Sequence, residues 1–249
     1  MFLALLTVQL ACKEALPVQK IIILVALSPG ELNRKIMLFV SRQDAGRQLG
    51  EFLRNCGISA DGVLGLPRGG VVVAAAVAQA LQRPLDVLVA RKIGHPWQRE
   101  FAVGALAEPD IVMLDPNFKW EDPRARAELN KVIVEERERL RECRSQFHHH
   151  DAMVFEGKTV LLVDDGLATG ATAEAAVISA RQQKARRVII AAPVASTHAV
   201  ERLRRMADEV GVLFTDPGFA ALGQYYAGFS EASDGEVLAL LRAGDGLTK

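Results

Sequence analysis

The sequence predicts an α/β protein with a doubly wound, mostly parallel sheet and helices on both faces. From residue 37 onward, short apolar runs alternate with longer stretches of helical spacing, the pattern of repeated β-α-β units. The apolar runs stop at Pro, Gly or Asp, as strands do. With 249 residues, 50% of them hydrophobic, the chain is long enough for one large core. It contains no internal repeat or low-complexity linker, so a single such domain is expected.

The elements follow one another regularly along the chain. A helix is expected at 41–57 because Ala45, Leu49 and Leu53 share one face and Gly57 can end it. Strands are expected at 62–66, 85–90, 110–114, 159–164, 187–195 and 210–214. The strand at 110–114 is weaker than the others and is expected at an edge of the sheet. Further helices are expected at 71–81, 123–147, 171–183 and 198–207. The helix at 123–147 has one apolar stripe and a solvated face of Glu and Arg, a surface that a homodimer could use.

The N-terminal segment differs in character from the rest. Residues 1–12 are apolar and resemble a signal-peptide core, and Cys12 follows Ala11 as in a lipoprotein, but no Lys or Arg precedes them. The apolar run at 21–27 is far shorter than the roughly 20 residues that span a bilayer. We therefore interpret residues 1–36 as an N-terminal extension and residues 37–249 as the domain, and expect no membrane attachment.

Charge and cysteine content narrow the class of protein. The formal net charge is zero, which gives no indication of binding to nucleic acid or to a membrane surface. The three cysteines are scattered without a CxxC pair, which favours reduced thiols and a cytoplasmic protein.

The most informative stretch is VLLVDDGLATGAT, residues 160–172. Four apolar residues of a buried strand lead into Asp164 and Asp165, and a loop of small residues then opens a helix. Backbone N–H groups at a helix N-terminus form a phosphate cradle, to which Thr169 and Thr172 can add hydroxyl donors. Capping alone needs one acid, whereas two adjacent carboxylates repel each other. A sugar diol explains them better, because each carboxylate can accept a hydrogen bond from one hydroxyl.

This pattern of two acids followed by x-x-x-Thr-Gly-x-Thr resembles the phosphoribosyl pyrophosphate motif of type I phosphoribosyltransferases. The resemblance covers roughly residues 37–229 and implies that Asp164 and Asp165 hold the ribose hydroxyls. It also implies a small hood over the sheet, and we assign residues 214–249 at the C-terminus to this hood or tail. The loop that would wrap the ribose 5′-phosphate comprises Gly166, Leu167, Ala168, Thr169, Gly170, Ala171 and Thr172.

Two other stretches support this resemblance. LPRGG, residues 66–70, lies where the family has its pyrophosphate loop, and Arg68 with Gly69 and Gly70 suits a diphosphate. ARKIG, residues 90–94, resembles the adenine enzymes at the start of a mobile flap, which implies that Arg91 and Lys92 contact pyrophosphate. Hypoxanthine–guanine enzymes carry an aspartate where this chain has Ala168, which argues against that specificity.

The implied activity is transfer of 5-phosphoribosyl from phosphoribosyl pyrophosphate to a nitrogen acceptor, a nucleobase in nucleotide salvage, with release of pyrophosphate. Asp164, Asp165, Arg91 and Lys92 are the catalytic candidates. Mg²⁺ would bridge pyrophosphate and ribose without a direct protein ligand. The alternative is a regulator that senses phosphoribosyl pyrophosphate without turning it over, although basic flap residues favour an enzyme. A dinucleotide-binding enzyme is not favoured, because no GxGxxG follows the first strand.

Aromatic and histidine clusters leave further alternatives open. Phe219, after Pro217 and Gly218, is the candidate for stacking on a base, whereas Tyr226 and Phe229 are expected in the core. The run His148–His150 could bind a transition metal, but an exposed cluster without a metal role is favoured. The acceptor and the oligomeric state are not determined by these patterns.

Overall fold

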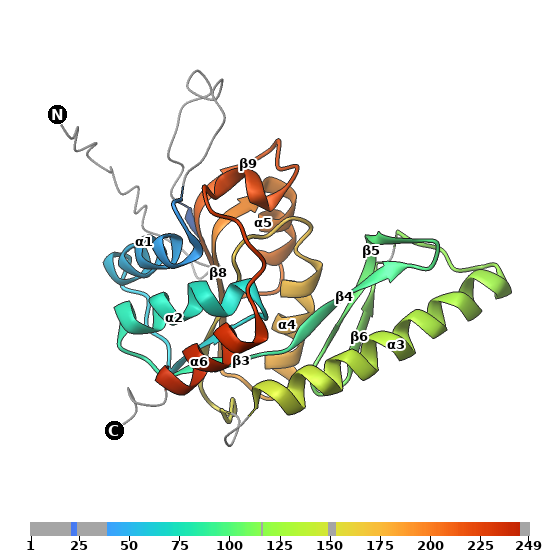
Figure 1. Ribbon diagram of the computed structural model, residues 1–249, viewed down its shortest axis with the longest axis horizontal. Helices are drawn as coiled ribbons and strands as arrows, with labels where there is room; N and C mark the ends of the chain where they lie inside the picture. The colour runs from blue at the N-terminus through green and yellow to red at the C-terminus, as the bar shows by residue number, and fades with distance from the viewer. Residues whose placement is uncertain (1–20, 24–38, 116, 149–152, 245–249) are drawn as a thin grey trace.

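The computed structural model describes residues 21–23, 39–115, 117–148 and 153–244 (Figure 1). The predicted class is confirmed: a six-stranded parallel sheet has the order β1-β9-β8-β7-β2-β3. Its strands are β1 (Ile21–Ile23), β2 (Gly62–Gly65), β3 (Leu85–Val87), β7 (Thr159–Val163), β8 (Arg187–Ser196) and β9 (Glu209–Asp216). Neighbours far apart in sequence, such as β2 and β7, therefore pair through crossovers, as a doubly wound sheet requires.

Helices cover both faces of this sheet. One face carries α1 (Arg42–Asn55), α2 (Gly69–Leu81) and α6 (Asp234–Gly244), and the other carries α4 (Ala171–Gln182) and α5 (Thr197–Leu203) (Figure 1). Successive side chains of a strand point to opposite faces. Accordingly, Leu161 and Val163 pack in the core with α1 and α2, whereas Val160 and Leu162 pack with α4 and α5. This two-sided burial explains why these strands are continuous apolar runs.

A second layer of structure projects from the core as an arm. It consists of an antiparallel sheet of β4 (Ala90–His95), β5 (Gln98–Ala107) and β6 (Ile111–Leu114), lined along its length by α3 (Pro123–Phe147) (Figure 1). The bounds of α3 match the predicted helix. Asp122 caps it by accepting a hydrogen bond from the N–H of Arg124, and Pro123 occupies the first turn. Leu129, Ile133 and Leu140 form its buried stripe.

The arm corrects two sequence-based expectations. The predicted strand at 85–90 is divided, because β3 ends at Val87 in the large sheet and β4 begins at Ala90 in the small one. The stretch expected to form a flap loop is instead a paired hairpin of β4 and β5, in which Ala90 pairs with Ala107. The strand at 110–114 is an edge strand, as expected, but of the antiparallel sheet. Local apolar patterns cannot show which sheet a strand joins, since pairing is a tertiary property.

The two ends of the described chain add elements that local patterns did not indicate. Within the predicted extension, β1 pairs in parallel with β9, with Ile22 opposite Gly211. In the predicted hood, a short 3₁₀ turn (Leu222–Tyr225) precedes α6. The backbone at Phe39 pairs with this segment, because its N–H donates to the Tyr225 carbonyl and its carbonyl accepts from Ala227 N–H, at 3.0 and 2.8 Å. Within the described ranges, no helix is both long and apolar enough to cross a membrane.

Candidate functional site

Two loops meet at the carboxyl ends of β2 and β7. These strands are parallel neighbours, with Gly65 opposite Val163, so the loops that follow them lie side by side at the edge where such sheets bind ligands. A Cβ atom on Gly69 would lie 2.0 Å from Oδ2 of Asp165, and one on Gly70 would lie 2.8 Å from the Val163 carbonyl oxygen. Only glycine fits at these two positions, because the acidic loop occupies the space that a side chain would need.

The two aspartates have different surroundings. Oδ1 of Asp164 accepts a hydrogen bond from the N–H of Asp165 at 2.9 Å. Burial and the neighbouring charge of Asp165 together hold the pKa of Asp164 well above its usual range. Asp165 instead forms an ion pair with Arg42, whose Nε lies 2.6 Å from Oδ2. Asp165 therefore has a cationic partner, whereas the proton of Asp164 is held more tightly than that of an ordinary carboxyl group.

The loop after the aspartates is anchored at one point and exposed at another. Leu167 is buried and pairs with β8, because its N–H donates to the Val194 carbonyl and its carbonyl accepts from Ser196 N–H. Ala168 and Thr169 are exposed at the start of α4. Gly170 has φ of +76°, a left-handed conformation that suits glycine and turns the chain into the helix. The turn leaves N–H groups at the start of α4, where an anion can bind.

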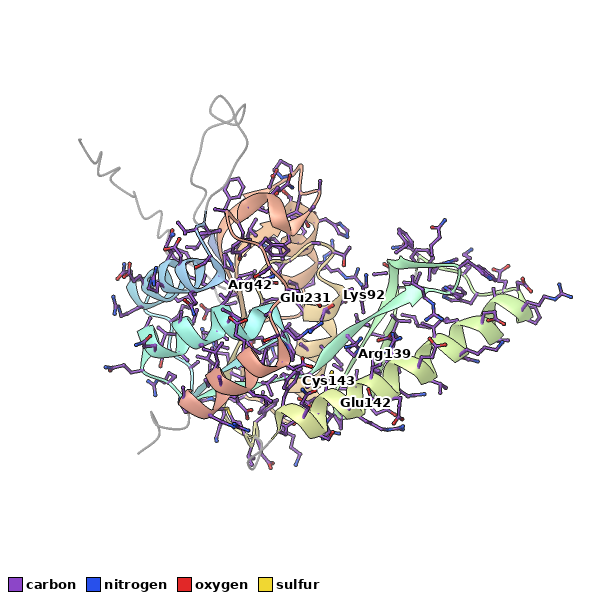
Figure 2. All side chains as sticks on the ribbon, viewed as in Figure 1. Arg42, Lys92, Arg139, Glu142, Cys143 and Glu231 are labelled. Carbon is purple, nitrogen blue, oxygen red and sulfur yellow. The ribbon has the colours of Figure 1, made fainter. Side chains whose placement is uncertain are left out.

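A cavity of about 630 Å³ lies between this loop and the arm. Asp164 and Thr172 line it from the core, and Lys92 and Arg139 line it from the arm (Figure 2). The other lining residues that carry charge are Arg91, Arg99, Glu135 and Glu136. The cavity thus combines a carboxyl group on one wall with four cationic side chains on the other, as a site for a polyanionic sugar requires.

The cationic side chains of the arm are paired with glutamates of α3. Nε of Arg91 donates to Oε2 of Glu136 at 2.8 Å, and Arg139 contacts the other oxygen of the same carboxylate. Arg99 pairs with Glu135 at 2.9 Å. Glu136 is buried, so its charge depends on these partners. An anion that enters the cavity would compete with these carboxylates for the same guanidinium groups.

The glycine loop faces a second cavity of about 410 Å³, lined among others by Arg42, Arg68 and Arg91. Arg68 precedes α2 and follows a cis peptide bond after Pro67. Its guanidinium pairs with Glu231 and lies 3.7 Å from Oδ1 of Asp234. These acidic side chains come from the C-terminal segment, so that segment lies against the predicted pyrophosphate loop.

Most predicted site residues come together here, but some do not. The predicted residues that line the two cavities are Arg68, Gly69, Arg91, Lys92, Asp164 and Thr172. Gly70 lies against Asp164, and residues 166–171 are not among those that line either cavity. Phe219 is not among the described residues that line them, and its ring packs against Tyr225 with centroids 5.1 Å apart. Tyr226 is buried as expected, whereas the expectation for Phe229 is wrong, because it is 43% exposed.

The expectation of an exposed histidine cluster is wrong for His148. Its Nε2 lies 2.9 Å from Oε2 of Glu108, and only 15% of its side chain is exposed. His149 and His150 lie outside the described residues. In the described part of the chain, no group of three or more His, Cys, Asp or Glu side chains could hold a metal ion.

Sequence patterns did not indicate three residues of this region: Arg42, Glu136 and Glu231. Each is a charged residue on a helix or loop of ordinary composition, and each contacts a predicted site residue that lies more than 40 positions away. No local signal distinguishes these charges from solvated ones, because their partners are determined by the fold.

Comparison with known proteins identifies the family. Residues 41–218 match the model of the phosphoribosyl transferase domain. The chain belongs to this family. It is 42% identical over 205 residues to a Mycobacterium tuberculosis protein named "Putative phosphoribosyl transferase", covering 82% of this chain and 46% of that one. The chain therefore spans about half the length of this relative.

Two further relatives of this phosphoribosyl transferase domain are informative. The crystal structure of TT1426 from Thermus thermophilus is 43% identical, covers 82% of this chain and 98% of that one, and superposes with a TM-score of 0.69. A ribose-phosphate pyrophosphokinase from Thermococcus kodakarensis is 30% identical over 141 residues, which cover 54% of this chain and 47% of that enzyme.

Proposed function

We propose that this phosphoribosyl transferase domain transfers the 5-phosphoribosyl group from phosphoribosyl pyrophosphate to a nitrogen acceptor, a nucleobase, and releases pyrophosphate. The observation that carries the proposal is the meeting of the acidic loop after β7 with the glycine loop after β2, beside a cavity walled by cationic side chains. A ribose diol, a terminal phosphate and a diphosphate each have a chemically matched partner within this region.

Each part of the donor is assigned to residues of this chain. Asp164 and Asp165 accept hydrogen bonds from the ribose hydroxyls and favour the positive charge that develops on the ring as the glycosidic C–O bond breaks. The loop from Gly166 to Thr172 binds the 5′-phosphate through N–H groups at the start of α4, while Leu167 anchors the loop to β8. Arg68, Arg91 and Lys92, with the N–H groups of Gly69 and Gly70, neutralise the departing pyrophosphate.

The residues present fit a Mg²⁺ ion that arrives with the donor. Mg²⁺ keeps waters and substrate phosphates in its shell, so it would be held through the pyrophosphate and ribose oxygens of the donor, and the cavity beside Asp164 has room for them. When bound, the metal neutralises charge on the leaving pyrophosphate. The arm, which forms the opposite wall of the cavity, limits the access of water that would otherwise hydrolyse the donor.

Pyrophosphate release from phosphoribosyl pyrophosphate and Mg²⁺ across a panel of nucleobases and amines tests the proposal. The test variant carries Asp164→Asn and Asp165→Asn. The matched control is Asp110→Asn, which removes an exposed carboxylate from the arm. Release that depends on one acceptor, and that is lost in the double variant but not in the control, would support the transferase and identify its substrate.

Two other outcomes discriminate the alternatives. Tight binding of phosphoribosyl pyrophosphate in calorimetry without turnover for any acceptor would favour a protein that senses this ligand. No binding in the presence of Mg²⁺ would contradict both functions, because both require the donor site.

A further inference from the structure

Arg42 is a buried cation beside the donor site that no sequence motif includes. It is the first residue of α1, directly after the helix cap Ser41. Only 11% of its side chain is exposed, as is 12% of Asp165, its partner at 2.6 Å. One terminal nitrogen of the guanidinium also donates to the carbonyl of Ser230 at 2.6 Å, so the group is fixed at two points.

Aromatic rings complete the surroundings of this guanidinium. Its central carbon lies 4.2 Å from the centroid of the Phe229 ring and 5.9 Å from that of Tyr226, which are cation–π distances. The hydroxyl of Tyr226 donates to the backbone carbonyl of Asp165 at 2.6 Å. The side chain of Asp165 is thus held by Arg42, and its backbone carbonyl is held by Tyr226, whose ring also contacts Arg42.

The pyrophosphate loop packs against the same ion pair. A Cβ atom on Gly69 would lie 2.7 Å from Nε of Arg42 and 2.0 Å from Oδ2 of Asp165. Arg42 therefore lies where α1, the acidic loop, the glycine loop and the C-terminal segment meet. Arg42 and Glu231 of that segment, both labelled over the core in Figure 2, line the same cavity.

Stability alone is a weak reason for such a pair. Burying two charges costs desolvation that their attraction only roughly offsets, so an apolar pair often serves a core equally well. What the ion pair does provide is a defined charge and a defined orientation for Asp165. This matters because Asp164 and Asp165 are adjacent in sequence, and two carboxyl groups so close tend to share one proton.

We propose that Arg42 is a positioning residue that holds the carboxylate of Asp165 in an ion pair and aligned for the ribose diol of the donor. The inference rests on the proposed function. The titratable groups that face Asp165 are Arg42 from α1, Asp164 from the same loop and Tyr226 from the C-terminal segment. Burial raises the pKa of Tyr226, and burial together with the charge of Asp165 raises the pKa of Asp164.

The experiment measures the Kd for phosphoribosyl pyrophosphate with Mg²⁺ by calorimetry from about pH 5 to 9. Arg42→Met removes the charge, Arg42→Lys keeps it, and Arg47→Met on the same helix is the control, since Arg47 forms an exposed pair with Asp44. We expect Arg42→Met to raise Kd at neutral pH by about 10- to 100-fold. We also expect the pH at which binding is half lost to move upward, because the two aspartates then share a proton.

The conservative variant distinguishes positioning from a general loss of structure. Arg42→Lys should recover most of the affinity and return the pH dependence toward that of the wild type, and Arg47→Met should change neither. Thermal unfolding monitors whether each variant is folded. If Arg42→Met does not fold, Arg42→Gln carries the test, because it also removes the charge but keeps a side chain that can donate a hydrogen bond to Asp165.

The outcomes separate this inference from the proposed function. A folded Arg42→Met variant with unchanged Kd and an unshifted pH dependence would overturn the inference alone, as would an Arg42→Lys variant that binds no better than Arg42→Met. If Arg42→Met does not fold, an Arg42→Gln variant with unchanged Kd and an unshifted pH dependence would overturn it. A wild-type protein that does not bind phosphoribosyl pyrophosphate contradicts the proposed function, and the role of Arg42 with it.

Discussion

The core and the arm of this molecule differ in how much ion pairing adds to apolar packing. Every residue of β7 is buried, and helices cover the large sheet on both faces. The tip of the arm exposes Trp97 and Phe101, at 63% and 52%, and ion pairs such as Arg91–Glu136 and Arg137–Asp110 join its strands to α3. Packing therefore determines where the acidic loop lies, whereas charge contributes strongly to where the cationic wall of the cavity lies.

Substitutions of apolar residues should show this difference most strongly. Leu161→Ala removes side-chain atoms from a fully buried strand, and we expect it to lower the free energy of unfolding by about 2–5 kcal/mol. Val134→Ala, on the exposed face of α3 at 63% exposure, should change it by no more than about 0.5 kcal/mol. Urea unfolding measures both. Similar losses for the two variants would show that the arm is packed as tightly as the core.

Glu136→Gln tests the contribution of charge to the arm. The substitution removes the carboxylate that Arg91 and Arg139 share, and we expect a loss of about 1 kcal/mol, because both arginines are partly exposed and solvent screens the pairs. Pyrophosphate should bind more tightly, since Arg91 no longer has a competing carboxylate. Calorimetry with pyrophosphate measures this, and Glu138→Gln, which breaks an exposed pair on the same helix, is the control. Weaker binding in Glu136→Gln alone would mean that Glu136 orients Arg91 for the anion.

Asp164→Asn should stabilise the core while removing donor binding. Burial and Asp165 raise the pKa of Asp164 in the folded state above that in the unfolded chain. The folded state therefore holds its proton more tightly, and the free energy of unfolding falls as pH rises from about 4 through the raised value. Asparagine removes this penalty, so Tm at neutral pH should rise by about 2 °C. Thermal unfolding at several pH values measures it. A lower Tm with a pH dependence unchanged from the wild type would contradict the assignment.

The smallest effect is expected where the C-terminal end of α3 meets the core. The hydrogen bond to Glu108 raises the pKa of His148 above its ordinary value of 6.5. Because the folded state holds the His148 proton more tightly than the unfolded chain does, protonation stabilises the folded state at pH values below the pKa of the unfolded chain. This contribution is lost as the pH rises through the pKa of His148 in the folded state. We expect amide hydrogen exchange in the last turns of α3 to quicken, beyond its intrinsic pH dependence, as the pH rises from about 6.5 through the raised pKa of His148. His148→Gln should abolish this additional change, and an equal change in both proteins would exclude His148 as its cause.

The arm also shows where prediction from local patterns ends. Its helix was predicted with the right bounds, because Asp122, Pro123 and a long apolar stripe are local signals. Its hairpin was expected as a loop, because the resemblance to the adenine enzymes implied a mobile flap that begins at Arg91 and Lys92. Pairing with β5 and packing against α3 stabilise that conformation, and neither is visible within a window of ten residues.

The sequence by itself determined where most core strands and helices follow one another along the chain, and where the acidic and glycine loops lie between them. Apolar periodicity and turn residues act over a few positions, and the loops lie at the carboxyl ends of strands that sequence alone can locate. Only the tertiary structure decided which charges meet. Arg42 reaches Asp165 across 123 positions, and Arg68 reaches Glu231 across 163. Such pairs have no sequence period, because a side chain finds its partner through the packing of whole elements rather than through spacing along the chain.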